Sequence, residues 1–123
     1  PGKGAGFGML KGKPIFVLPG GPPSNMMAFL QIALPGLQAL SGYANPGLPR
    51  QKARLGSDLS GGDRDWTDFL FGTLSSDGDK RVFHPMRKRT RLSAVAQATA
   101  IATIPEGEDH LAEGSVIDIQ ILP

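Results

Sequence analysis

The stretch Lys13-Pro-Ile-Phe-Val-Leu-Pro-Gly-Gly-Pro-Pro-Ser24 joins a short apolar run to a dense run of turn residues. Residues 14–18 are apolar without interruption, which is typical of a buried strand. Residues 19–24 are proline, glycine and serine, which favour a turn. Ser24 is a preferred N-cap residue of helices. The stretch therefore predicts a buried strand, a turn and the start of a helix.

The segment after this turn predicts a helix over residues 25–40. Apolar residues recur in it at three- and four-residue spacing, and further apolar residues lie on its other sides. We therefore expect this helix to be covered on more than one face. Pro35 removes a backbone donor and is predicted to kink or split the helix. Gly42 predicts its end, because glycine commonly follows a helix C-terminus.

The strand, turn and helix form a candidate anion-binding site. Backbone N–H groups at a helix N-terminus attract anions, by about 0.3–1 kcal/mol per charge at exposed positions. Ser24 adds a hydroxyl, and Lys3 adds a positive charge if the glycine-rich arm of residues 1–13, a loop or weak edge strand, folds near the turn. The alternative is that Ser24 only caps the helix and the glycines only form the turn, because the spacing matches neither glycine motif of phosphate loops.

Composition excludes several classes of protein. The 123 residues are 40% hydrophobic and 20% charged, as in a globular chain, and no apolar run reaches the roughly 18 residues of a membrane-spanning helix. The net charge of +2 is too small to indicate nucleic-acid binding by bulk charge. Because the chain has no cysteine, it forms no disulfide, Cys-ligated zinc site or thiol nucleophile, which fits a cytoplasmic protein.

Residues 45–50 are rich in proline and glycine and are predicted to be a linker between residues 1–44 and residues 51–123. The second part predicts short strands and turns, and Asp77-Gly78 is a strong hairpin signal. The predicted elements are strands at 51–55, 66–74, 81–86, 100–104 and 115–122 and a helical turn at 92–97. The fold class is therefore α+β and mostly β, with a small barrel or sandwich as its second part.

Several stretches, in order along nearly the whole chain, resemble the molybdopterin molybdotransferase family, which includes MoeA and one half of gephyrin. Residues 13–24 resemble the family segment GKPVFGLPGNPVS, and Pro1-Gly-Lys3-Gly resembles its KPGKP segment. Residues 92–107 resemble LSSLARADGLIVLPEG, and the chain from His110 onward matches the ending L-x-x-G-x-x-V-x-V-x-L.

This resemblance implies that residues 1–44 are the closing strand and helix of a molybdopterin-binding α/β domain and that residues 51–123 are the small C-terminal β-barrel domain. The family reaction takes adenylylated molybdopterin and molybdate, hydrolyses the adenylyl bond with a divalent cation such as Mg²⁺, and yields molybdenum cofactor and AMP. The resemblance also implies a cytoplasmic homodimer without a membrane or nucleic-acid partner. We expect no metal ion or cofactor to be tightly bound to this part of the protein.

By matched position, the resemblance implies a binding role for four residues. Lys3 and Ser24 would contact molybdate or the substrate anion, while Gly20 and Gly21 would allow close backbone approach. Gly21 stands where the family usually has asparagine, and Pro23 stands where it has valine, so the side-chain hydrogen bonds of this turn differ from the family pattern. No catalytic residue is assigned.

The family motifs that hold the pterin and the cation have no counterpart in this sequence. We therefore expect the chain to be the C-terminal piece of a larger transferase and to be inactive alone. The alternative is a free-standing small barrel that binds a partner or RNA through its basic cluster, Arg87, Lys88, Arg89 and Arg91. No aromatic residue interrupts this cluster, which disfavours base stacking. A helix that is apolar on several faces also favours the first interpretation, because a free-standing barrel does not need one.

Overall fold

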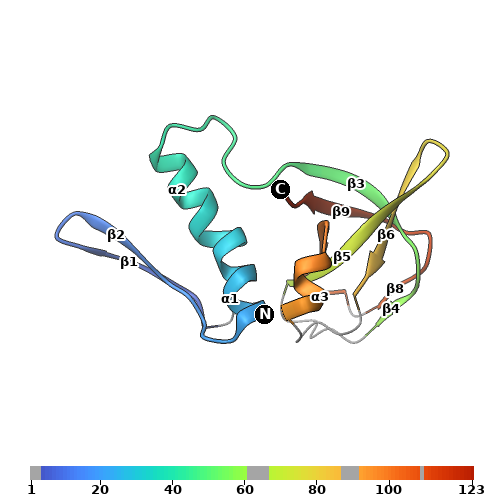
Figure 1. Ribbon diagram of the computed structural model, residues 1–123, viewed down its shortest axis with the longest axis horizontal. Helices are drawn as coiled ribbons and strands as arrows, with labels where there is room; N and C mark the ends of the chain where they lie inside the picture. Colours follow the sequence, from blue (N-terminus) through green and yellow to red (C-terminus); the bar gives the residue numbers. More distant parts are fainter. Residues whose placement is uncertain (1–3, 61–66, 87–91, 109) are drawn as a thin grey trace. The chain divides into compact units, whose positions relative to one another are not determined.

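The computed structural model describes residues 4–60, 67–86, 92–108 and 110–123 (Figure 1). The chain divides into two compact units, Pro1–Leu48 and Pro49–Pro123. The first unit contains a β-hairpin and a long helix, and the second contains a β-barrel. The predicted mostly β fold with a small barrel is confirmed.

The first unit begins with an antiparallel hairpin of strands β1 (Gly6–Leu10) and β2 (Lys13–Val17). Its loop is Lys11-Gly12, and both residues have a positive φ, 50° and 76°. This backbone is that of a type I′ turn, whose twist matches the twist of the two strands. Residues 1–13 were predicted to be either a loop or a weak edge strand. The structure shows a strand, β1, in this arm.

Strand β2 forms where the apolar run predicted it, but the prediction that it is buried is wrong within the described residues. The side chains of Ile15 and Val17 are 41% and 54% exposed. Only the opposite face is covered, where the ring of Phe16 lies 5.2 Å from the ring of Phe7 and packs closely on Gly36. Alternate side chains of a strand point to opposite faces, so the described part of the first unit covers one face of β2.

The helix runs without a break through α1 (Pro22–Ala28), a π-helical turn η1 (Phe29–Ala33) and α2 (Leu34–Leu40). Pro35 causes the irregular turn, because it lacks an N–H and its ring would clash with the carbonyl four residues earlier. The helix widens instead of breaking, and the N–H of Leu34 donates to the carbonyl of Phe29, five residues back. At Pro35, where a kink or a split was predicted, the helix instead contains a local π-helical turn.

The helix end matches the prediction. Ser41 is the C-cap, and Gly42 follows with a φ of 88°. The N–H groups of Ser41 and Gly42 donate to the carbonyls of Leu37 and Ala39 at 3.0 and 3.1 Å. Glycine closes the helix because it adopts the left-handed conformation without steric cost.

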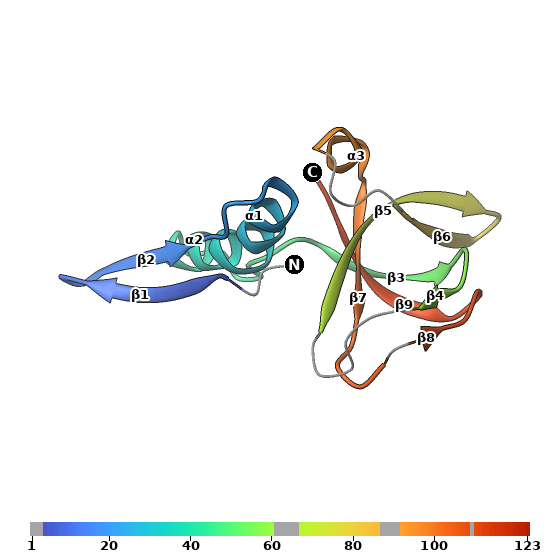
Figure 2. The same ribbon diagram turned by 90° about the horizontal axis from the view of Figure 1, so that it is seen from below.

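The second unit is a closed barrel of five strands in the order β3-β6-β5-β7-β9 (Figure 2). The strands are β3 (Arg50–Leu55), β5 (Asp68–Asp77), β6 (Lys80–Pro85), β7 (Ala100–Ile104) and β9 (Val116–Ile121). The predicted helical turn is α3 (Leu92–Gln97). The sequence did not predict β4 (Leu59–Ser60) and β8 (His110–Leu111), two-residue strands that pair with each other.

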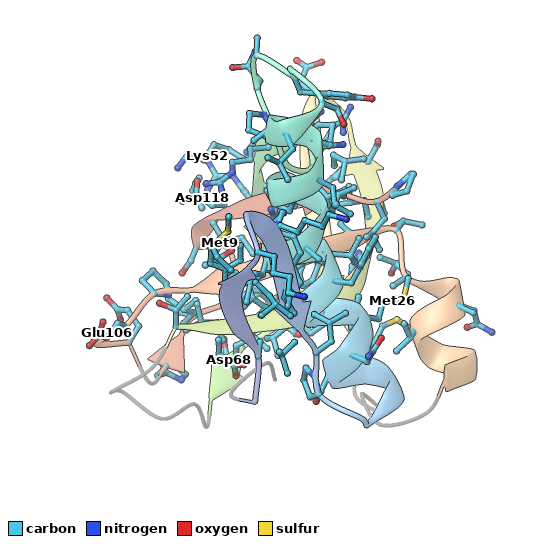
Figure 3. All side chains as sticks on the ribbon, turned by 90° about the vertical axis from the view of Figure 1, so that its left-hand side faces the viewer. Met9, Met26, Lys52, Asp68, Glu106 and Asp118 are labelled. Carbon is cyan, nitrogen blue, oxygen red and sulfur yellow. The ribbon has the colours of Figure 1, made fainter. Side chains whose placement is uncertain are left out.

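The barrel core is formed by inward-facing residues of alternating strand positions. Its cluster of buried residues consists of Ala53, Leu55, Phe83, Ala100, Ala102, Ile117 and Ile119. On the outer face, Lys52 and Asp118 lie opposite each other on β3 and β9 and form an exposed ion pair (Figure 3). The predicted hairpin joins β5 to β6, but its loop is Gly78-Asp79, one residue later than expected, because Gly78 takes the positive φ of 63°.

Candidate anion-binding site

The candidate site is the turn of residues 19–24 between β2 and α1. Gly21 is the helix N-cap, and Pro22 and Pro23 occupy the first helical positions. The N–H of Asn25 donates to the carbonyl of Gly21 at 2.7 Å, which is the first hydrogen bond of the helix. The predicted N-cap role of Ser24 is therefore wrong. Proline suits the first helical turn, so the helix starts three residues earlier than predicted and Ser24 lies inside that turn.

This start changes which backbone donors the helix presents. The first N–H groups of a helix have no partner within it, but Pro22 and Pro23 carry no N–H. The donors that this turn offers are therefore the N–H groups of Gly20, Gly21 and Ser24 and the hydroxyl group of Ser24. The helix N-terminus therefore presents fewer backbone donors than a helix that begins at Asn25 without these prolines.

Gly20 and Gly21 are exposed, and a Cβ added at either would meet no atom within 4 Å. Gly21 has a φ of −70° and a ψ of 135°, a backbone that other residues also adopt. Nothing in the described chain therefore requires glycine at Gly21. The open space is compatible with the predicted close approach of a ligand to this backbone.

Asn25 is a residue of the site that the sequence analysis missed. Its side-chain Nδ2 donates to the carbonyl of Pro19 at 2.9 Å and so spans the turn. Asparagine readily forms such hydrogen bonds to nearby backbone groups, and its position directly after Ser24 was the available signal. Asn25 therefore links the helix start to the beginning of the turn.

The structure brings together three of the four predicted site residues, Gly20, Gly21 and Ser24. Lys3 lies outside the described residues, as does the basic cluster of residues 87–91. The predicted contribution of Lys3 to the site thus stays a prediction.

Magnesium is the cation that the resemblance implies, and the described residues do not fit it. No three His, Asp or Glu side chains come together within the part of the chain that is described. Asp58 instead accepts a hydrogen bond from the N–H of Glu113 at 2.7 Å, and His84 pairs with Ser75, with 2.8 Å between Nε2 and Oγ. These groups serve local contacts rather than a metal site.

No helix within the described ranges is both long and apolar enough to cross a membrane.

Comparison with known proteins identifies the family. Residues 52–122, more than half of the chain, match the family model described as MoeA C-terminal region (domain IV). A curated relative, molybdopterin molybdenumtransferase 2 of Mycobacterium tuberculosis, is 30% identical over 125 residues, which cover 97% of this chain and 29% of the relative. The same values hold for the protein of strain H37Rv.

Solved structures agree with this match. A molybdopterin biosynthesis MoeA protein from Pyrococcus horikosii has 28% identity and a TM-score of 0.77, over 98% of this chain and 29% of its own. A second MoeA structure, from Pyrococcus horikoshii OT3, has a TM-score of 0.72 over 94% of the chain, and at 20% identity it supports the fold alone. This chain spans 29% of the length of these relatives. The chain belongs to the MoeA family, and residues 52–122 form the C-terminal domain IV of that family.

Proposed function

We propose that the protein containing this chain inserts molybdenum into adenylylated molybdopterin in the biosynthesis of molybdenum cofactor. The observation that carries the proposal is the family match, because the similarity to a molybdopterin molybdenumtransferase extends over 97% of this chain. It therefore includes the turn of residues 19–24 as well as the barrel. In this proposal the protein is a transferase, and the chain contributes one wall of its substrate site.

The proposal assigns residues 1–44 to the end of a molybdopterin-binding α/β domain, residues 45–50 to a linker and residues 51–123 to the barrel domain. Exposed side chains support this assignment. Among the described residues, every exposed large hydrophobic side chain except Val116 lies in residues 1–48. Large exposed apolar patches are rare on complete soluble domains, so the first unit has the surface of a domain whose other elements lie outside it.

The turn of residues 19–24 is proposed to bind the anionic part of the substrate. The N–H groups of Gly20, Gly21 and Ser24 and the Ser24 hydroxyl would donate to oxygen atoms of molybdate or of a phosphate, and Lys3 would add a charge. Hydrogen bonds to ionised acceptors are about twice as strong as those between neutral groups. Donors that are already oriented also stabilise charge that develops during hydrolysis of the adenylyl bond, without reorganising. Asn25 would keep these donors in place.

We further propose that the protein is a cytoplasmic homodimer and that Mg²⁺ is held by residues other than those described. The absence of cysteine supports the cytoplasmic assignment. The alternative of an RNA-binding barrel receives no support from the described part of the barrel. Proteins bind single-stranded RNA by stacking its bases on exposed aromatic rings. In the described part of the barrel, the one exposed large hydrophobic side chain is Val116, which is not aromatic.

The proposal is tested by incubating the whole protein with adenylylated molybdopterin, Mg²⁺ and molybdate and measuring release of AMP and formation of molybdenum cofactor. We expect AMP release that depends on molybdate. The 123-residue chain alone serves as the control and should release none. Absence of AMP release by the whole protein, in an assay where an established molybdopterin molybdenumtransferase is active, would contradict the proposal.

A further inference from the structure

We propose that Asn25 is a positioning residue for the turn of residues 19–24 and that it acts on one backbone donor, the N–H of Gly20. The inference rests on the proposed function, in which this turn binds a tetrahedral oxyanion, either molybdate or a phosphate of the substrate. It adds to that function the side chain that orients a donor before the oxyanion binds.

Asn25 contacts the turn at both ends of the Gly20-Gly21 pair. Its backbone N–H donates to the carbonyl of Gly21 at 2.7 Å. Its side-chain Nδ2 donates to the carbonyl of Pro19 at 2.9 Å. The backbone hydrogen bond belongs to the helix and forms with any residue except proline at position 25. The contact to Pro19 requires a side-chain donor, so it is the contact that depends on asparagine.

The contact to Pro19 determines the direction of the Gly20 N–H. The carbonyl of Pro19 and the N–H of Gly20 belong to the same peptide unit. The peptide bonds of the described residues are trans, so this unit is planar and its C=O and N–H point in opposite directions. Because the carbonyl is held toward Asn25, the Gly20 N–H points to the side of the peptide unit away from Asn25.

Gly20 has a backbone whose direction needs to be fixed. Glycine has more conformational freedom than any other residue and loses more of it when it is ordered. A Cβ added at Gly20 would meet no atom within 4 Å, so side-chain packing by the described residues does not restrict this position. A donor that is oriented before the ligand arrives avoids the cost of ordering on binding. Asn25 therefore raises the affinity for the oxyanion through Gly20, without contacting the oxyanion itself.

The test compares Asn25→Ala with Gln38→Ala in the whole protein. Both substitutions remove an amide side chain from the same helix and one hydrogen bond to the backbone, since Oε1 of Gln38 accepts from the N–H of Gly47 at 2.7 Å. Binding of molybdate and of adenylylated molybdopterin is measured separately by calorimetry. Urea unfolding is measured on the same variants, as are the NMR order parameters of the Gly20 and Ser24 N–H groups without ligand.

We expect the dissociation constant of one of the two ligands to rise about 3- to 10-fold in Asn25→Ala, the effect of one lost hydrogen bond. A rise for molybdate identifies molybdate as the oxyanion at Gly20, and a rise for adenylylated molybdopterin alone identifies a phosphate. The order parameter of Gly20 should fall from about 0.85 to below about 0.6, while that of Ser24, which lies in the helix, stays unchanged.

Stability separates a positioning role from a structural one. The midpoint of urea unfolding of Asn25→Ala should stay close to that of wild type, because alanine favours a helix more strongly than asparagine and offsets the lost contact. Gln38→Ala should leave both dissociation constants and the Gly20 order parameter unchanged. A fall in the urea midpoint of Asn25→Ala that accompanies the loss of affinity would assign Asn25 a structural role and contradict the proposal.

Two further results would overturn it. Unchanged affinity of Asn25→Ala for both ligands, with affinity reduced in Ser24→Ala, would contradict the role of Asn25 and leave the proposed anion site intact. An unchanged Gly20 order parameter would also contradict it, and that measurement needs no ligand. Absence of binding by wild type would instead contradict the proposed function, so the two failures are distinguishable.

Discussion

Gly72 of β5 lies directly against the ring of Phe83 of β6. A Cβ added at Gly72 would lie 2.6 Å from Phe83 Cε2 and 2.5 Å from the carbonyl oxygen of His84. Phe83 is completely buried and is the largest of the fully enclosed side chains among the described residues. The barrel therefore closes around this ring because position 72 has no side chain.

Gly72→Ala is expected to destabilise the barrel. The ring and the backbone oxygen both block the added methyl group, and overpacking of this kind costs about 1–3 kcal/mol. Gly8→Ala is the control on another strand, since a Cβ at Gly8 meets no atom within 4 Å, and its effect should stay within about 0.5 kcal/mol. Urea unfolding of both variants measures the difference. Equal stability of Gly72→Ala and wild type would contradict the observed packing.

Gly56 and His84 are expected to be energetically coupled. A Cβ at Gly56 would lie 2.8 Å from His84 Nδ1, while Nε2 of the same ring is held 2.8 Å from Ser75 Oγ. Gly56→Ala should displace the ring and lower the free energy of unfolding. In the His84→Ala variant, which lacks the ring, the same substitution should lower the free energy of unfolding by less. A double-mutant cycle should give a coupling of about 0.5–3 kcal/mol, the range for residues in contact. Simple additivity of the two substitutions would show that the ring does not restrict Gly56.

Gly21→Asn is expected to stabilise the helix. Gly21 is the N-cap but offers no side chain to the helix N-terminus, and asparagine is a preferred N-cap residue. Because Pro22 and Pro23 lack N–H groups, the asparagine side chain would accept from the N–H of Ser24. The expected gain is a few tenths of a kcal/mol in urea unfolding. Gly20→Asn is the control, since that position precedes the N-cap, and an equal gain from it would contradict the assigned helix start.

Much of the barrel could be predicted because its strands carry local signals. Ile117 and Ile119 alternate with Val116 and Asp118, and the structure buries the first two and exposes the others. The β1–β2 hairpin could not be predicted, because its turn requires a positive φ at Lys11, which lysine rarely adopts. The pairing of β4 with β8 joins two-residue segments far apart in the sequence, and no local pattern indicates such a contact.

The site was predicted in part for similar reasons. Glycine, proline and serine indicate a turn at residues 19–24 irrespective of which residue begins the helix. The position of the turn was therefore predicted correctly. The role of Ser24 depends on where the helix begins, and two consecutive prolines at the first helical positions shift that start to Pro22. The burial of β2 was overestimated because an apolar run predicts cover on both faces, whereas the described residues cover only one.

Ser24→Ala is expected to leave stability almost unchanged. An N-cap serine contributes about 1 kcal/mol, but Ser24 is not the N-cap, so the loss should stay within about 0.5 kcal/mol. Thermal or urea unfolding checks this value. A loss of 1 kcal/mol or more would indicate that Ser24 caps the helix, in contradiction to the structure, where Gly21 is the N-cap.

The most direct test of the account is the affinity of the whole protein for adenylylated molybdopterin and molybdate in the Ser24→Ala variant. Loss of a hydrogen bond to a charged group costs about 1.5–3 kcal/mol, so we expect the dissociation constant of the anionic ligand to rise about 10- to 100-fold. Ser41→Ala is the matched control, because Ser41 lies at the other end of the same helix and donates to the carbonyl of Leu37. Its affinity should equal that of wild type. Unchanged affinity and unchanged AMP release in Ser24→Ala would contradict the claim that the turn of residues 19–24 binds the substrate anion.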